Sequence, residues 1–188
     1  SGVPSRPLTE EANQVMSVPP ANMLLEVFHR LYSRYGPQHW WPGDSQFEII
    51  IGAILTQSTA WTNVEKALNN LKNAGVLSPE ALRDIPEADL AQLIQPSGYF
   101  NAKAKKVKAF MAYLCGAHHG DLDSLLHGNP ACLRDELLSI YGIGPETADD
   151  IVLYAAELPS FVIDAYTRRV LERLGLDQGA TTYDEYQQ

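Results

Sequence analysis

The chain has 188 residues and a formal charge of −9 at pH 7, with 45% hydrophobic and 20% charged residues. This balance predicts one folded domain or two small ones and excludes a disordered or fibrous protein. The longest apolar run, residues 49–55, is far shorter than the roughly 20 residues that a membrane span needs. The net negative charge argues against nucleic-acid binding unless local charge and backbone donors provide the contacts.

The first part of the chain has one clear helical pattern. Residues 1–21 are rich in Pro and Ser and are expected to form a loose leader. From Met23 to Tyr35 apolar residues follow helical spacing, and Gly36-Pro37 ends the predicted helix. Residues 47–55 are too continuously apolar for a surface helix, so they form a buried helix or a core strand, which Asp44 or Ser45 can cap.

The later segments all have helical spacing, which predicts an all-α fold. Trp61 to Leu71 keep a 3.6-residue period, and Ser78-Pro79 and Asn129-Pro130 place a capping side chain before a proline. Asn101 is predicted to cap a long helix. The last two predicted helices begin at Pro145, with Ala148, Ile151, Val152 and Ala155 facing inward, and at Tyr166, ending before Gly175.

The segment that is most informative about function joins two of these helices through Gly142-Ile143-Gly144-Pro145. Glycine permits a tight turn with close backbone approach, and Pro145 favours the start of the next helix. Free N–H groups at this helix start can bind a phosphate without any lysine. The same residues also fit a simple connector in a helical bundle, and the turn alone does not decide between the two.

Asp164 is the candidate acidic residue of the site. It follows three apolar residues, Phe161 to Ile163, and precedes the last predicted helix. It can be an N-cap, the commonest use of Asp at this place. A carboxylate at an apolar connection can also be partly desolvated, which makes it a candidate acid, base or charge stabiliser.

Together these motifs resemble the helix-hairpin-helix DNA glycosylase superfamily, which includes endonuclease III, over about residues 44–176. Within it, the sequence is most similar to the branch of bacterial 3-methyladenine DNA glycosylase III. The resemblance rests on Trp40-Trp41-Pro42, on residues 52–57 and 96–105, on Gly142-Ile143-Gly144 and on Tyr183-Asp184-Glu185.

The resemblance implies an all-α fold of two helical subdomains with an active-site cleft between them. Residues 22–43 plus 165–188 would form a terminal subdomain, and residues 44–164 a helical barrel with the helix-hairpin-helix at about 131–157. The sequence ends at Gln188 within an expected helix, so a further C-terminal part is expected.

The resemblance also assigns the reaction. Asp164 aligns with the essential aspartate, which would stabilise positive charge at the sugar while the base leaves. Relatives that also cut the DNA strand use a lysine in the second hairpin helix as a Schiff-base nucleophile. This sequence has Glu146 at that place. The sequence therefore predicts a monofunctional enzyme. It would flip alkylated or damaged bases, such as 3-methyladenine, out of duplex DNA and hydrolyse their N-glycosidic bond.

Other roles follow from the same resemblance. Gln57 would fill the gap left by the flipped base. Trp40, Trp41 and Trp61 would line a pocket for a cationic base, although core packing explains each of them equally well. The expected DNA-backbone contacts are Gly142, Ile143, Gly144, Glu146, Thr147 and Lys103.

Cofactors, partners and location are expected as follows. No cofactor is required, and these residues hold no iron–sulfur cluster, since two cysteines are too few. The resemblance also implies a site for Na⁺ or K⁺ at the backbone carbonyls of Leu138, Ile140 and Ile143, which leaves no side-chain signature in the sequence. The expected partner is double-stranded DNA with damaged bases, with no membrane, and the protein is expected to be a monomer in the bacterial cytoplasm, at the nucleoid.

Two other functions remain open from sequence. One is an endonuclease III-like glycosylase and lyase with a relocated amine. The other is a non-catalytic helix-hairpin-helix module that binds DNA or a repair partner, which the net acidity would suit.

Overall fold

The computed structural model describes residues 20–187, so the predicted loose leader lies almost wholly outside the described residues. The chain divides into two units, Ser1–Gln38 and His39–Gln188. Residues 165–187 thus share a unit with residues 44–164. The predicted pairing of 22–43 with 165–188 concerns the relation between the units and stays a prediction.

In the first unit, the described residues form helix α1 (Pro20–Tyr35), as the apolar spacing predicted. Gly36 ends this helix with a φ of 69°, and its N–H donates to the Tyr32 carbonyl at 2.7 Å. Phe28 and Tyr32 lie one turn apart and stack on each other with ring centroids 5.7 Å apart.

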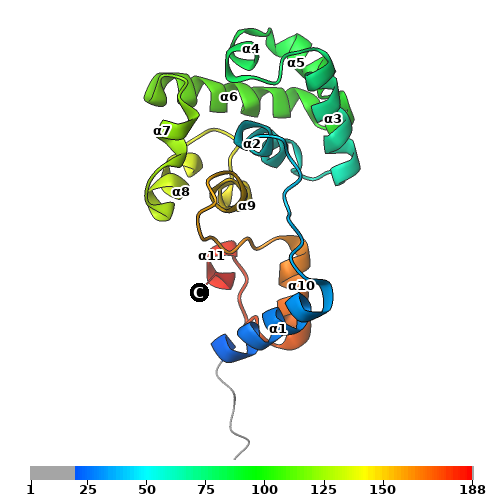
Figure 1. Cartoon of the computed structure of the whole chain (residues 1–188), viewed down its shortest axis with the longest axis vertical. Helices are drawn as coiled ribbons and strands as arrows, with labels where there is room; N and C mark the ends of the chain where they lie inside the picture. The colour runs from blue at the N-terminus through cyan, green and yellow to red at the C-terminus, as the bar shows by residue number, and fades with distance from the viewer. Residues whose placement is uncertain (1–19, 188) are drawn as a thin grey trace, which may run out of the picture. The chain divides into compact units, whose positions relative to one another are not determined.

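The second unit is built of short helices, shown in Figure 1. In chain order they are α2 (Gln46–Leu55), α3 (Trp61–Asn73), α4 (Pro79–Asp84), α5 (Glu87–Leu93), the 3₁₀ turn η1 (Gln95–Ser97), α6 (Phe100–His118), α7 (Leu122–Leu126), α8 (Pro130–Leu138), α9 (Pro145–Asp150), the π-helical turn η2 (Ile151–Ala155), α10 (Ala165–Leu174) and α11 (Tyr183–Tyr186). Residues 20–187 include no strand, and the all-α prediction is confirmed. None of the helices in this range is long and apolar enough to cross a bilayer.

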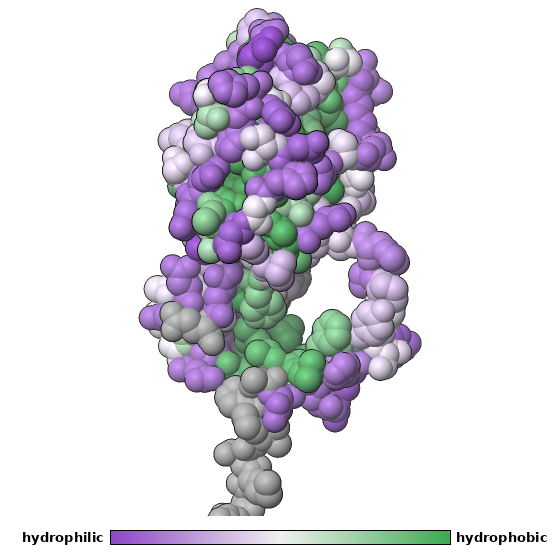
Figure 2. Space-filling view, turned by 60° about the vertical axis from the view of Figure 1, so that its left-hand side comes forward, coloured by the Kyte–Doolittle hydropathy of each residue, from purple (hydrophilic) through white to green (hydrophobic). Residues whose placement is uncertain are grey.

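Helix α2 forms the centre of the core, which resolves the choice between a buried helix and a core strand. It contacts α3, α6, α9 and η2, so apolar residues are needed all round it. Ile50, Ile51, Ile54 and Leu55 are fully buried. The Ser45 hydroxyl caps the helix by accepting from the Glu48 N–H at 3.2 Å. On the face drawn in Figure 2, polar residues cover most of the upper body of the molecule, with some hydrophobic residues showing between them.

The helix-hairpin-helix consists of α8, the turn at residues 139–144, and α9 continued by η2. Asn129 caps α8 as predicted, with its side chain accepting from the Ala131 N–H at 2.9 Å. The four residues predicted to face inward are all buried, namely Ala148, Ile151, Val152 and Ala155. The hairpin is thus fixed to the core through its second helix.

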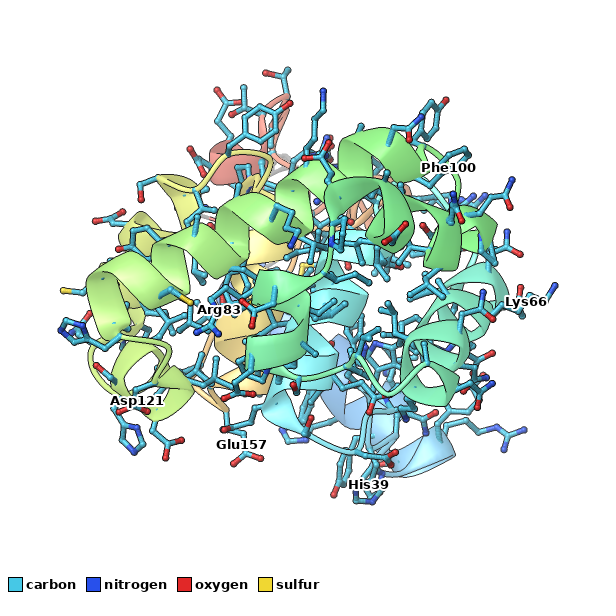
Figure 3. All side chains as sticks on the ribbon, turned by 90° about the horizontal axis from the view of Figure 1, so that it is seen from above. His39, Lys66, Arg83, Phe100, Asp121 and Glu157 are labelled. Carbon is cyan, nitrogen blue, oxygen red and sulfur yellow. The ribbon has the colours of Figure 1, made fainter. Side chains whose placement is uncertain are left out.

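Helix α6 begins differently from the prediction. It starts at Phe100, after Tyr99 in the left-handed conformation with a φ of 45°. Asn101 lies inside the helix with its side chain exposed, so the predicted cap is wrong. Figure 3 shows Phe100 at this end of α6 and Arg83 on the neighbouring α4.

The structure also corrects the position of Lys103. Its side chain is buried with 2% exposure, and its ammonium donates to the carbonyls of Leu55 at 2.8 Å and Ser97 at 2.5 Å. Burial lowers the pKa of Lys103 to about 8. This position does not fit the predicted contact of Lys103 with the DNA backbone, because the group joins α2 and η1 to α6 inside the core.

We expect Lys103→Met to lower the free energy of unfolding by about 2–3 kcal/mol, because two buried carbonyls lose their charged donor. Urea unfolding measures the change. Lys105→Met is the matched control, since Lys105 is exposed two residues away and should change stability by less than about 0.5 kcal/mol. Equal stability of the two variants would contradict the structural role of Lys103.

Candidate active site

Asp164 is both the cap of a helix and a carboxylate with a free oxygen. Its Oδ1 accepts from the Thr167 N–H at 2.7 Å, which makes it the N-cap of α10. Its Oδ2 accepts no hydrogen bond from the residues that the structure describes, and the side chain is half-buried. The two sequence interpretations, cap and reactive carboxylate, are therefore compatible in one residue.

The backbone before Asp164 is held by the C-terminal part of the unit. The N–H of Ile163 donates to the hydroxyl of Tyr183 at 3.1 Å, and Ile163 itself is fully buried. Burial is the main reason why the pKa of this tyrosine is raised, so it stays a neutral phenol. Tyr183 therefore fixes the position of the residue next to Asp164.

A second set of contacts fastens the same segment to the hairpin. Asp149 on α9 is fully buried and accepts from Arg134 at 3.0 Å, from Ser160 at 2.7 Å and from Gln187 at 2.9 Å. Arg134 also donates to Asp184 on α11 at 3.2 Å. One buried carboxylate thus joins α8, α9, the connection before Asp164 and the end of the described chain.

Three acidic side chains act on one another beside the hairpin. Glu146 is exposed to solvent, but the protein atoms around its carboxyl partly desolvate it, and this and next the charge of Asp164 raise its pKa. Burial also raises the pKa of Asp150 to about 7, with smaller contributions from Glu146 and Asp164. Asp150 is 7% exposed and was not among the predicted site residues. Its signal in the sequence was its place four residues after Glu146, one turn along the same helix face.

A cavity of about 380 Å³ lies at the start of the second hairpin helix. It is lined by Thr56, Gln57, Ser58, Gly144, Pro145, Glu146, Thr147, Arg168 and Tyr183. The structure thus brings together Gln57, three predicted residues of the hairpin and Tyr183, which holds the segment before Asp164. The cavity does not include the tryptophans.

The hairpin turn has the geometry that its glycines predicted. Gly142 has a φ of 84°, which an L side chain rarely adopts, and a Cβ there would lie 2.3 Å from Cγ of Lys106. Gly144 is the N-cap of α9, and the N–H groups of the first turn have no acceptor within the helix. The side chains of Ile143 and Thr147 are buried, so the backbone is what these residues offer to a phosphate.

Gln57 is bonded to this turn. Its Nε2 donates to the Gly142 carbonyl at 3.1 Å, and its Oε1 accepts from the Lys106 ammonium. The predicted role of Gln57 in filling a gap in DNA stays a prediction. To fill that gap, the side chain would have to leave both partners.

The three tryptophans form one aromatic cluster together with Tyr154. Ring centroids are 5.8 Å apart for Trp40 and Trp41, 5.4 Å for Trp40 and Trp61, and 5.2 Å for Trp41 and Trp61. Tyr154, which the sequence did not single out, lies 5.6 Å from Trp41. Nε1 of Trp41 is an enclosed donor with no partner. What this cluster can offer to a ligand is therefore its aromatic faces, since the unpaired donor of Trp41 is enclosed.

The predicted cation ligands are carbonyls at the hairpin turn. Ile140 O already accepts from the Ile143 N–H at 3.1 Å. A carbonyl oxygen has a second lone pair, so the three oxygens of Leu138, Ile140 and Ile143 fit the oxygen-donor chemistry of Na⁺ or K⁺. The cation itself stays a prediction.

We expect Tyr183→Phe to remove the acceptor of the Ile163 N–H. Hydrogen exchange at the Ile163 amide should become faster, and the free energy of unfolding should fall by about 1 kcal/mol. Tyr186→Phe is the control, since the Tyr186 hydroxyl bonds to Glu172 on the surface. Unchanged protection of Ile163 in Tyr183→Phe would contradict the proposed anchor.

Comparison with known proteins agrees with this geometry. The family described as the HhH-GPD superfamily of base excision DNA repair proteins matches residues 51–188. A Methanocaldococcus jannaschii protein named as a DNA repair glycosylase is 42% identical over 165 residues, covering 87% of this chain and 74% of the relative.

Solved structures show the same fold. The H. pylori 3-methyladenine DNA glycosylase bound to 1,N6-ethenoadenine has a TM-score of 0.76 and 30% identity, over 89% of this chain and 78% of that chain. A trapped endonuclease III–DNA covalent intermediate has a TM-score of 0.75 at 22% identity, over 88% and 74% of the two chains. The chain therefore belongs to the HhH-GPD superfamily of base excision DNA repair proteins, as a DNA glycosylase.

Proposed function

We propose that the chain is a monofunctional DNA glycosylase that hydrolyses the N-glycosidic bond of alkylated bases, of the 3-methyladenine type, in duplex DNA. The observation that supports this most directly is the pair of Asp164 and Glu146. A carboxylate with a free oxygen stands beside the position where strand-cutting relatives have a lysine. Asp164 can stabilise a sugar cation, and at the position of Glu146 the chain has no amine that could form a Schiff base.

In this mechanism, the C1′–N bond breaks and its electron pair leaves with the base. Positive charge then develops on the sugar, and the free Oδ2 of Asp164 faces that charge. The Thr167 N–H fixes the other oxygen, so the carboxylate does not have to reorganise during the reaction. A water molecule adds to C1′, and Asp164 orients it.

The aromatic cluster supports the choice of base. An alkylated purine nucleotide with a quaternised nitrogen carries a delocalised positive charge, which the faces of tryptophan rings attract. Trp40 is 49% exposed, so at least one ring of the cluster is accessible. The similar H. pylori protein is named for 3-methyladenine and holds a modified adenine.

DNA is the partner of the family, and an acidic chain has to bind it with few cations. The first-turn amides at Gly144, Glu146 and Thr147 would hold a phosphate at the helix start. A Na⁺ or K⁺ ion at the carbonyls of Leu138, Ile140 and Ile143 would add positive charge at the same turn.

Asp164→Asn should lower the rate of 3-methyladenine release from alkylated duplex DNA at least about 100-fold, because the sugar cation loses its counter-charge. The fold should persist, since Asn caps helices as well as Asp does. Asp135→Asn, at an exposed position on α8, is the matched control. Release by Asp164→Asn at the rate of the unchanged protein would overturn the proposal.

Borohydride reduction should trap no covalent adduct between this protein and lesion-bearing DNA, because Glu146 cannot form an imine. Glu146→Lys, which places an amine at this position, is the positive comparison.

The alternative is a lyase with a relocated amine, and the structure gives it one candidate. Lys106 contacts Gln57 at the edge of the hairpin. An adduct with the unchanged protein that disappears in Lys106→Gln would establish the lyase and refute the monofunctional assignment.

A further inference from the structure

One face of the second hairpin helix connects the cavity to the aromatic cluster. Glu146, Asp150 and Tyr154 follow one another at intervals of four residues, so they lie about one turn apart on this face. Glu146 lines the cavity, and Tyr154 contacts Trp41. Asp150 is the group between them.

The side chain of Asp150 is buried and has no partner. It is 7% exposed, and no hydrogen bond to it exists among the residues that the structure describes. Within those residues, Nε1 of Trp41 is the sole fully enclosed polar side-chain atom without a partner. The oxygens of Asp150 are therefore not fully enclosed.

The groups that face Asp150 leave it without a counter-charge. The charges that act on it are those of Glu146, Asp164 and Asp149, and all of them are negative. Burial mainly raises the pKa of the phenols of Tyr154 and Tyr183, and the negative charge of Asp150 adds to both shifts. Of the nearby arginines, Arg134 is paired with Asp149, and the guanidinium of Arg168 lies over the rings of Tyr183 and Tyr186.

Such a site favours the protonated carboxyl, since a buried and unpaired carboxylate is costly. Burial raises the pKa of Asp150 to about 7, so the group exchanges a proton near neutral pH. Asp150 thus has a raised pKa, while the nearby Asp164 accepts from a helix N–H. Other hydrolases also place two carboxyl groups in different environments, where one acts as the acid and the other as its charged partner. No three His, Cys, Asp or Glu side chains in residues 22–187 are grouped to bind a metal ion.

We propose that Asp150 is the proton donor for the departing base, which extends the reaction of this enzyme to electrically neutral damaged bases. This inference rests on the proposed glycosylase function. As the C1′–N bond breaks, the base keeps the electron pair and takes the proton of Asp150 on a ring nitrogen. Water adds to C1′, and the proton that it releases passes through Asp164 back to Asp150. Asp164 remains the charge facing the sugar.

The division of labour depends on the charge of the base. A cationic alkylated base leaves as a neutral molecule and needs no proton. A neutral modified base would leave as an anion unless an acid protonates it, so it depends on Asp150. Loss of Asp150 should therefore affect the release of neutral bases and not that of cationic bases.

The experiment measures single-turnover release of two bases by the same chain, with 1,N6-ethenoadenine as the neutral base and 3-methyladenine as the cationic one. Asp150→Asn should slow release of the neutral base at least about 100-fold and of the cationic base less than about threefold. Asp135→Asn should alter neither. Equal slowing of both bases by Asp150→Asn would show a structural role and overturn the proposal.

The pH profile tests the same idea without any variant. Release of the neutral base should fall above about pH 7, where Asp150 loses its proton, while release of the cationic base should not. Parallel profiles for the two bases would contradict the proposal. If the protein releases 3-methyladenine but no neutral base, the proton-donor proposal fails and the proposed glycosylase stands. If it releases neither, the proposed function fails as well.

Thermal unfolding shows whether Asp150→Asn folds. Its pH dependence also shows whether Asp150 holds a proton in the folded protein. The pKa of Asp150 rises from 3.8 to about 7 on folding, so between these values the folded chain binds a proton that the unfolded chain has lost. Stability therefore falls as pH rises through this window. From pH 4 to pH 7, the unfolding temperature of the unchanged protein should therefore fall relative to that of Asp150→Asn. A difference between the two unfolding temperatures that stays constant over this pH range would contradict a buried, protonated Asp150.

Discussion

The hydrogen bond from the Thr167 N–H to Oδ1 of Asp164 is the interaction on which the site depends. It starts α10, and it also leaves the second oxygen of the same carboxylate free. A helix N-terminus favours negative charge, and a carboxylate at this cap suits the start of α10. One structural hydrogen bond thus fixes the carboxylate that we propose to be reactive.

The elements around Asp164 hold it from two sides. Tyr183 bonds to the backbone of Ile163, and the buried Asp149 joins α8 and α9 to the segment before Asp164. These contacts come from residues far apart in the chain. The position of Asp164 relative to the hairpin is therefore set by tertiary packing, while its role as a cap is local.

The placement of backbone amides and lysines also explains how a chain with a net charge of −9 can be a DNA glycosylase. Backbone amides at a helix start do not need lysine to meet a phosphate. The lysines of α6 are largely used within the fold, since Lys103 is buried, Lys106 binds Gln57, and Lys108 binds the carbonyls of Leu82 and Arg83. Net charge alone is therefore a poor guide to the partner of this protein.

Sequence reasoning succeeded where the physics is local. Helical spacing, the caps at Ser45 and Asn129 and the turn at Gly142 depend on neighbouring residues, and the structure confirms them. It failed for Lys103 and Asn101, because burial and the left-handed Tyr99 are set by distant packing and by the preceding turn. It missed Asp150 and Tyr154, since the burial of Asp150 and the contact of Tyr154 with Trp41 are set by residues far apart in the chain.

A crystal structure of the protein with duplex DNA that contains a cationic pyrrolidine in place of the damaged nucleotide tests the central claim most directly. The ring nitrogen carries the positive charge that develops on the sugar. The account predicts an oxygen of Asp164 within about 3.5 Å of that nitrogen, with the Thr167 hydrogen bond intact. A pyrrolidine seated away from Asp164, with the carboxylate facing only α10, would contradict it.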